Sequence, residues 1–222
     1  MSVATVPRVI AIDGPAGAGK STIAKLVADA TGLPYLDTGA MYRCIAHACL
    51  RGGVDPTDAV SVGELARSAR IVVDRGHVEV NGEDVTAVVR SSEVGAVVSV
   101  IAAHTPVRDA LRRQQREWIA EHGGGVVEGR DIGTVVFPDA LLKVFLTASP
   151  EVRAARRVAQ VGGDVAEIAR GIAERDLLDS SREDSPLRPA AESRTVDSSN
   201  KSIEEVVAEI VGLYEASTGK VA

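Results

Sequence analysis

A glycine-rich octapeptide at residues 14–21, Gly-Pro-Ala-Gly-Ala-Gly-Lys-Ser, restricts the folds open to this chain more than any other segment. The residues before it, 8–13, read Arg-Val-Ile-Ala-Ile-Asp, a β-branched apolar run that is typical of a buried parallel strand. Residues 20–30 after it carry apolar side chains at helical spacing, and Gly32 follows as a helix stop. The segment therefore predicts a strand, a tight glycine loop and a helix in direct succession.

The rest of the chain continues to alternate between strand-like and helix-like segments. Short apolar runs predict further strands at 34–37, 126–128, 141–147 and 195–197. Apolar periodicity and start signals predict helices at 39–50, 92–103, 105–121, from Pro150 to the Gly162-Gly163 break, 165–178 and 202–214. Strands that alternate with helices favour a parallel sheet with helices on both faces. We therefore expect an α/β, three-layer fold with a five-stranded parallel sheet.

Residues 55–90 differ from this alternation. Residues 71–74 and 77–80 are short β-like runs, and Asn81-Gly82 is a turn signal. We expect a small insert that contains a hairpin. Residues 180–190 are polar and contain proline, which predicts a loop.

Composition excludes several classes of protein. Of 222 residues, 45% are hydrophobic, which is ordinary globular usage and argues against native disorder. No apolar run approaches the ~20 residues that a membrane span needs, and no apolar stretch near the N-terminus resembles a secretion signal. A net charge of −6 and 3% aromatic residues do not suit nucleic-acid binding. We expect a cytoplasmic monomer with neither nucleic acid nor membrane as a partner.

The two cysteines, Cys44 and Cys49, lie five residues apart in a helix-like stretch. This spacing puts them on different faces of the helix, so a disulfide between them is geometrically unfavourable. They are predicted to be packed free thiols, as in a reducing compartment.

The octapeptide matches the phosphate-binding pattern G-x-x-x-x-G-K-[ST]. Glycines let successive backbone N–H groups point at one anion, and the following helix adds its positive end. Lys20 would carry a charge to the β- and γ-phosphates, and the Ser21 hydroxyl would bind Mg²⁺, partly through water. The predicted ATP-binding residues of this segment are Gly14, Pro15, Ala16, Gly17, Ala18, Gly19, Lys20, Ser21 and Thr22.

This motif alone does not name a function, because switch GTPases, motor ATPases and small-molecule kinases all carry it. The guanine-reading sequence Asn-Lys-x-Asp is missing, since Asn200-Lys201-Ser202 is followed by isoleucine. The phosphoryl acceptor must therefore be sought elsewhere in the chain.

Three clusters are rich in groups that bind anions and base edges. Residues 36–43 and 128–134 begin at the ends of predicted strands, and loops at the carboxyl ends of parallel strands line the ligand crevice. The third cluster lies within residues 175–182. Each has a purely structural explanation as well. Arg43 could be a solvated helix residue, and Arg130 with Asp131 could be a surface ion pair. Arg175 and Asp179 form an i,i+4 pair that could merely stabilise the surface of a helix.

Four phrases make a resemblance specific: Ile-Asp-Gly-Pro-Ala-Gly-Ala-Gly-Lys-Ser-Thr, Leu-Asp-Thr-Gly-Ala-Met-Tyr-Arg, Gly-Glu-Asp-Val-Thr and Glu-Gly-Arg-Asp-Ile-Gly-Thr-Val-Val-Phe-Pro-Asp. With them the chain resembles the bacterial cytidylate kinases from about Val9 to Tyr214. The resemblance implies one P-loop kinase domain over residues 1–222, with its core at 8–54, 91–150 and 175–217. It also implies a monophosphate-binding insert at about 55–90 and a mobile lid at about 151–174. Residues 151–174 include Arg153, Arg156 and Arg157, of which Arg156 and Arg157 are expected to bind ATP.

The resemblance also implies roles for individual residues in transfer from ATP to CMP or dCMP. The catalytic residues would be Lys20, Arg130 and Arg182. The acceptor would be bound by Thr38, Arg108 and Asp131 at the base, by Arg43, Arg130 and Arg182 at the phosphate, by Ser99, Arg175 and Asp179 near the sugar, and by Tyr42. Glu128 and Thr38 depart from the family, which often has aspartate and serine at these positions.

Two other functions stay open on the sequence. A kinase of a small hydroxyl substrate, of the shikimate type, would use Asp37 as the base at a strand end. A nucleotide-dependent switch would bind ATP or GTP, turn over slowly and signal by conformation.

Overall fold

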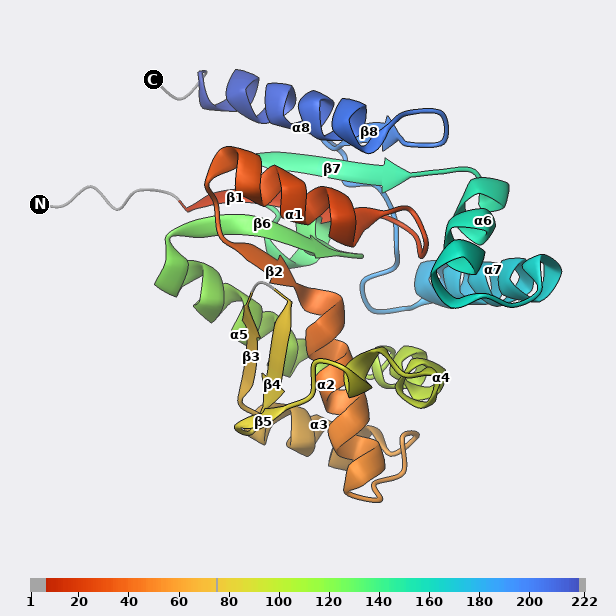
Figure 1. Cartoon of the computed structure of the whole chain (residues 1–222). Coiled ribbons are helices and arrows are strands. Elements are labelled where there is room, and N and C mark those ends of the chain that lie inside the picture. The colour runs from red at the N-terminus through yellow and green to blue at the C-terminus, as the bar shows by residue number, and fades with distance from the viewer. Residues whose placement is uncertain (1–6, 75, 220–222) are drawn as a thin grey trace, which may run out of the picture. The chain divides into compact units, whose positions relative to one another are not determined.

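A parallel sheet of five strands, in the order β2-β6-β1-β7-β8, organises the computed structural model of this chain (Figure 1). The structure describes residues 7–74 and 76–219. Two compact units divide the chain: residues 1–35 with 119–222, and residues 36–118. The α/β class and the five-stranded parallel sheet are therefore confirmed. The expected insert at 55–90 lies within the second unit, and its bounds and those of the lid stay predictions.

Strand β1 (Arg8–Asp13) lies at the centre of the sheet and is buried on both sides, as its apolar run predicts. It pairs with β6 (Gly124–Gly129) and with β7 (Leu142–Thr147). The register sets Ile12 against Glu128 and Asp13 against Gly129. The carboxyl ends of β1 and β6, which carry these polar residues, therefore lie side by side. Strand β8 (Arg194–Asp197) extends the sheet beyond β7, and β2 (Tyr35–Asp37) forms the opposite edge.

Helices α1 (Lys20–Thr31) and α8 (Ile203–Thr218) pack together, and both contribute to the core above the sheet. That core joins Ile10 and Ile12 of β1 to Val27 of α1 and Ile210 of α8. Helix α8 begins at a capping box, in which the Ser202 hydroxyl accepts from a backbone N–H and a glutamate side chain returns the bond.

Helices α6 (Pro150–Val161) and α7 (Val165–Ser181) form a pair that packs side by side. The predicted break between them is confirmed, because Gly162 and Gly163 both have positive φ, at 71° and 100°. Such backbone is accessible to glycine at little cost, so the chain reverses here.

The second unit contains α2 (Thr38–Arg51), α3 (Ala59–Ser68), α4 (Ser92–Ile101) and α5 (Thr105–His122), of which α5 continues past its boundary. Its sheet is antiparallel, with β3 (Ile71–Asp74), β4 (His77–Val80) and β5 (Glu83–Asp84). The predicted turn is confirmed, because Asn81 and Gly82 have φ of 55° and 83°, as a two-residue hairpin turn requires.

Among the described residues, four elements were not expected from the sequence, one of them a 3-10 turn at Val88–Arg90. Two others are strand β5, which follows the turn at Asn81, and helix α3, which lies in the same insert and has Asp58 as its N-cap. After β6 comes a short π-helical turn, Ile132–Val136. Such turns are rare and occur often at functional sites.

Both cysteines of the second unit are buried and unbonded to each other, as predicted. Burial, with the nearby charge of Asp37, raises the pKa of the Cys44 thiol to about 12. Its thiolate is therefore scarce at neutral pH.

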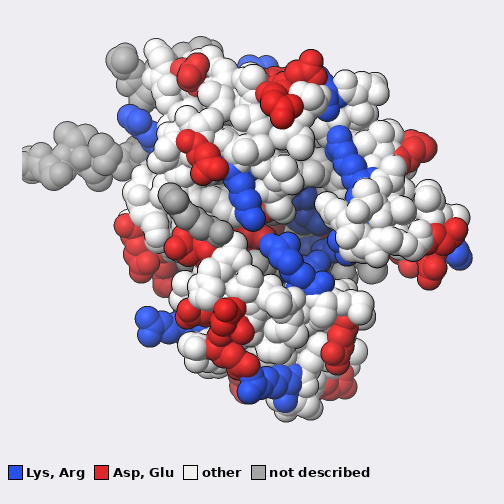
Figure 2. Space-filling model, viewed as in Figure 1, with Lys and Arg blue, Asp and Glu red and all other residues white. Residues whose placement is uncertain are grey.

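Within residues 7–74 and 76–219, no single helix has the length and apolar character of a membrane span, and only α4 with α5, bent by 101°, passes that test as a pair. On the face drawn in Figure 2, acidic groups are widely distributed with basic groups among them, in keeping with the net charge of −6.

Candidate active site

The glycine loop lies between β1 and α1 in the first unit, where the sequence predicts it. Gly14, Gly17 and Gly19 have φ of 153°, 78° and 88°, in the region that favours glycine. A Cβ at Gly14 would lie 2.0 Å from the Leu146 carbonyl oxygen, so this position admits no side chain. The loop can therefore curl against the end of β7 only because these positions are glycines.

Lys20 is the first residue of α1, and its side chain is buried. The Nζ ammonium donates to the Pro15 carbonyl at 2.8 Å, so the lysine folds back over its own loop. Burial, and next the positive charge of Arg130, hold the pKa of Lys20 well below its ordinary value. Arg175 adds to this effect, whereas Glu128 and Asp13 oppose it.

These influences show that charged side chains from distant parts of the first unit converge on Lys20. Arg130 follows β6, and Arg175 lies on α7. Both are among the residues that the sequence assigns to the acceptor. Guanidinium and ammonium groups gathered beside a glycine loop favour anions with several charges, such as phosphates.

Asp179 of α7 holds two of the predicted arginines together. Its buried carboxylate accepts from Arg130 Nε at 2.8 Å through one oxygen and from Arg182 through the other. The guanidinium groups of Arg130 and Arg182 therefore share one counter-ion, and Asp179 is committed to positioning them. Asp179 therefore does not merely stabilise its own helix through Arg175, which the i,i+4 spacing alone had allowed.

Ser21 and Glu128 meet beside the loop. The Ser21 hydroxyl donates to Glu128 Oε2 at 3.1 Å, and the Tyr35 hydroxyl donates to Glu128 Oε1. Tyr35 thereby orients a carboxylate that is longer than the aspartate common in the family. This role of Tyr35 was not expected from the sequence, because the tyrosine lies outside every motif.

Asp13 is a second residue to which the sequence analysis assigned no role, although it stands in the quoted phrase before the loop glycines. It ends β1, and its carboxylate accepts from Ile132 N at 2.8 Å and Gly133 N at 2.7 Å, the start of the π-helical turn. Burial, despite these hydrogen bonds, raises its pKa from 3.8 to about 6, and the charge of Asp131 adds to the effect. Its place immediately before the first loop glycine was the available signal.

The raised pKa of Asp13 predicts a pH-dependent penalty in stability. Ionisation is harder in the folded chain than in the unfolded one, so no penalty exists below pH 3.8, where Asp13 is protonated in both states, and the full penalty is reached once pH has risen through about 6. The difference between a pKa of 3.8 and one of about 6 corresponds to ~3 kcal/mol of unfolding free energy. We expect the unfolding free energy of the native chain, relative to Asp13→Asn, to fall by about that amount between pH 3.5 and 7.

Urea unfolding across this range measures the difference. The asparagine of the variant would set an amide N–H against a backbone N–H, so a constant offset between the two chains is expected, and the slope with pH carries the test. Asp139→Asn, which removes an exposed carboxylate, should run parallel to the native chain. Parallel curves for Asp13→Asn as well would contradict the assignment.

Of the arginines expected near ATP, the structure brings two to the loop. Arg156 donates to the Ser198 carbonyl at 2.8 Å and to its hydroxyl at 3.0 Å, and it approaches the Ala18 carbonyl at 3.4 Å. Arg153 donates to the Ala16 carbonyl at 3.1 Å. Arg157 is exposed, and its guanidinium donates to Gln160 on the same helix. Thr22 is exposed on α1.

The second unit contains the other predicted acceptor residues. Arg108 of α5 is buried, with its guanidinium 5.8 Å from the centre of the Tyr42 ring and bonded to the Ala102 carbonyl at 3.1 Å. Arg43 of α2 donates to the Val89 carbonyl at 3.3 Å. Ser99 of α4 is half-buried.

Thr38 begins α2 and is buried, with Asp37 before it as the N-cap. The Asp37 carboxylate accepts from Ala40 N at 2.9 Å and lies 3.7 Å from the Arg90 guanidinium. Both carboxylate oxygens therefore have structural partners, which disfavours Asp37 as a general base. Arg90 is a further cation that the motifs did not indicate.

The sequence pattern of the cytidylate kinases matches residues 10–216. The chain belongs to the cytidylate kinase family. A cytidylate kinase from Mycobacterium leprae is 45% identical over 218 residues, which cover 96% of this chain and 98% of that protein.

A bifunctional pantoate ligase/cytidylate kinase from Prochlorococcus marinus is 47% identical over 217 residues. The match covers 93% of this chain but 44% of that protein, so this cytidylate kinase family member spans less than half the length of the bifunctional relative. Among solved structures, TT1252 from Thermus thermophilus has a TM-score of 0.52 at 20% identity, covering 95% of this chain and 97% of that one. That likeness shows the shared fold.

Proposed function

We propose that this chain transfers the γ-phosphoryl group of ATP to CMP or dCMP, giving ADP and the nucleoside diphosphate. The observation that carries the proposal is the convergence of Arg130 and Arg182 on Asp179, with Arg130 close enough to Lys20 to lower its pKa. Membership of the cytidylate kinase family supports the same substrates.

In the proposed reaction, an oxygen of the acceptor phosphate attacks the γ-phosphorus as the bond from the γ-phosphorus to the bridging oxygen of ADP breaks. The second pKa of such a phosphate is about 6, so the acceptor is mostly dianionic at neutral pH and needs no strong base. Catalysis then consists of in-line positioning and neutralisation of charge. Lys20 leaves the Pro15 carbonyl for the donor phosphates, and Arg130, Arg182 and Arg43 bind the acceptor phosphate.

Mg²⁺ fits the groups beside the loop. The Ser21 hydroxyl and the Glu128 carboxylate are oxygen donors in contact with one another. Among the described residues, no group of three or more His, Cys, Asp and Glu side chains forms a ready metal site. Mg²⁺ usually takes one or two protein ligands and completes its shell with water and phosphate, so a sparse donor set agrees with it. The ion would neutralise charge on the donor phosphates.

Cytosine recognition is proposed for Thr38, Arg108 and Asp131. A carboxylate accepts from the exocyclic amino group of cytosine, and a guanidinium donates to its O2 and N3. Uracil reverses the donor and acceptor order at two of these positions, which would leave buried polar groups unpaired at about 1–3 kcal/mol each. Ser99, Arg175 and Tyr42 are proposed to contact the rest of the acceptor, and Arg156 and Arg157 the ATP.

A coupled ADP-release assay with Mg²⁺ and ATP tests the proposal across AMP, GMP, UMP, CMP, dCMP and shikimate. We expect the highest kcat/KM for CMP and dCMP. Preference for a guanine, adenine or non-nucleotide acceptor would overturn it. ATP turnover that is slow and independent of CMP would instead favour a nucleotide-dependent switch.

A further inference from the structure

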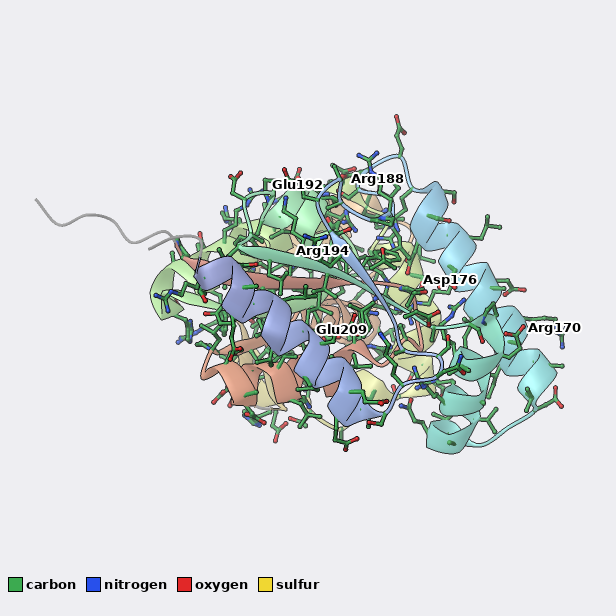
Figure 3. All side chains as sticks on the ribbon, turned by 90° about the horizontal axis from the view of Figure 1, so that it is seen from above. Arg170, Asp176, Arg188, Glu192, Arg194 and Glu209 are labelled. Atoms are coloured by element: carbon green, nitrogen blue, oxygen red, sulfur yellow. The ribbon has the colours of Figure 1, made fainter. Side chains whose placement is uncertain are left out.

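Side chains from α6 and α7 bind both backbone polar groups of Ala16 in the glycine loop, its N–H and its carbonyl. The Ala16 N–H donates to Asp176 Oδ1 at 3.3 Å, and the Ala16 carbonyl accepts from Arg153 at 3.1 Å. Arg153 and Asp176 also form an ion pair with each other. Three groups therefore close a ring of interactions around one loop residue. Asp176 lies on α7 (Figure 3).

Burial makes this arrangement more than a surface ion pair. The side chains of Arg153 and Asp176 are 10% and 22% exposed. Arg153 is further fixed by a bond from Nε to the Ala148 carbonyl at 3.2 Å. A Cβ at Gly17 would lie 3.1 Å from Arg153 Cβ, so the loop packs directly on α6. Solvent screening is reduced here, and removal of one partner leaves the other poorly compensated.

The loop needs such a restraint because its sequence is permissive. Ala16 lies between Gly14 and Gly17, both with positive φ, and glycine has more backbone freedom than any other residue. A loop that is already in its binding conformation loses less entropy when a phosphate binds. The Ala16 ties thus favour a preformed set of loop N–H groups.

Helix α7 also carries the carboxylate that positions the acceptor arginines. Asp176 and Asp179 are three residues apart and therefore lie on one face of the helix. Asp176 contacts the glycine loop, and Asp179 contacts Arg130 and Arg182. One face of α7 thereby binds both the loop proposed for the donor and the arginines proposed for the acceptor phosphate.

We propose that Arg153 and Asp176 are positioning residues that hold the glycine loop in its nucleotide-binding conformation. This rests on the proposed function for the identity of the donor, ATP. Neither side chain needs to contact the reacting atoms. Their effect should consequently fall on donor binding and leave acceptor binding nearly unchanged.

Isothermal titration of purified protein with ADP and Mg²⁺, and separately with CMP, measures both effects. We expect Asp176→Asn and Arg153→Gln each to weaken ADP binding about tenfold and to change CMP binding less than about twofold. The double variant should also lose about tenfold rather than a hundredfold, because partners in one network act non-additively. Asp176→Glu and Arg153→Lys, which keep the charges, should recover part of the affinity.

Two variants on α7 serve as matched controls. Glu174→Gln removes a carboxylate two residues from Asp176, and Arg170→Gln removes a guanidinium at the outer part of the helix pair (Figure 3). Both side chains are exposed, and both variants should bind ADP as the native chain does.

Unchanged or tighter ADP binding in folded Asp176→Asn and Arg153→Gln would overturn the proposal, as would full additivity in the double variant. Should these two fail to fold, native ADP affinity in the charge-preserving variants would also overturn it. ADP binding is measured without turnover, so a failure of the positioning proposal can be told apart from a failure of the proposed function. A native chain that does not phosphorylate CMP but shows the tenfold ADP effects overturns the proposed function and supports the positioning roles.

Discussion

Lys20→Ala lowers kcat by about 10²–10³-fold while the chain remains folded; this is the largest effect we expect from a single substitution. One preorganised donor aimed at developing charge contributes on this scale in other enzymes. In the proposed reaction the lysine must neutralise the donor phosphates, and two of the nearby arginines, Arg130 and Arg182, are held away from that task by Asp179. ADP release with saturating ATP and CMP measures the effect.

Stability should move in the opposite direction from activity. Burial lowers the pKa of Lys20, which means that the fold disfavours its charged form. Lys20→Met removes that charge and retains much of the volume, so its thermal midpoint at pH 7 should equal or exceed that of the native chain. Such an exchange of stability for activity is common where a binding group is held in an unfavourable environment.

The lowered pKa of Lys20 also sets the direction of the pH dependence. The charged lysine is the active form, so kcat/KM for ATP should decline as pH rises through a value well below the ordinary 10.5. Lys201→Ala is the matched control for Lys20→Ala, since that lysine is partly exposed and pairs with Glu209 on the surface. Near-native turnover by Lys20→Ala would contradict the proposed mechanism.

The sequence predicted the sheet and the loop because their signals are local. The β-branched run of β1, the glycine pattern and the helical periodicity of α1 each lie within one short segment. Strand β5, with two residues, and the π-helical turn at 132–136 have no such periodicity. They depend on pairing and hydrogen bonds that form only in the folded chain, such as those from Ile132 and Gly133 to Asp13.

The same limit explains why the sequence assigned no individual role to Asp13, Tyr35 and Asp176. Lys20 and Ser21 were predictable because the motif fixes their spacing. Asp13, Tyr35 and Asp176 act through partners that are 93 to 160 residues away along the chain. The register of β1 against β6, the place of β2 beside β6, and the contact of α7 with the loop bring these pairs within hydrogen-bond distance.

Arg182→Ala is expected to lower kcat about 10²-fold, the second large effect, which is on the scale of one lost donor to developing charge. Arg182 shares the Asp179 carboxylate with Arg130, so its guanidinium is held ready for a phosphate rather than sampling solvent. Its removal takes one positive charge from a reaction that must bring two polyanionic nucleotides together. The fold should persist, because Asp179 keeps its bond to Arg130 and is not left as an unpaired buried charge.

Arg182→Lys distinguishes the contribution of the positive charge from that of the planar guanidinium group. Lysine keeps the charge but not the bidentate geometry, so it should recover only part of the lost rate. Arg188→Ala is the matched control: this arginine is exposed on the segment that follows α7 (Figure 3), and its loss should leave kcat unchanged. Two outcomes would contradict the acceptor-phosphate role of Arg182: native kcat for CMP in Arg182→Ala, or a loss of rate only in proportion to the unfolded fraction. Either would mean that the contact between Arg182 and Asp179 serves folding alone.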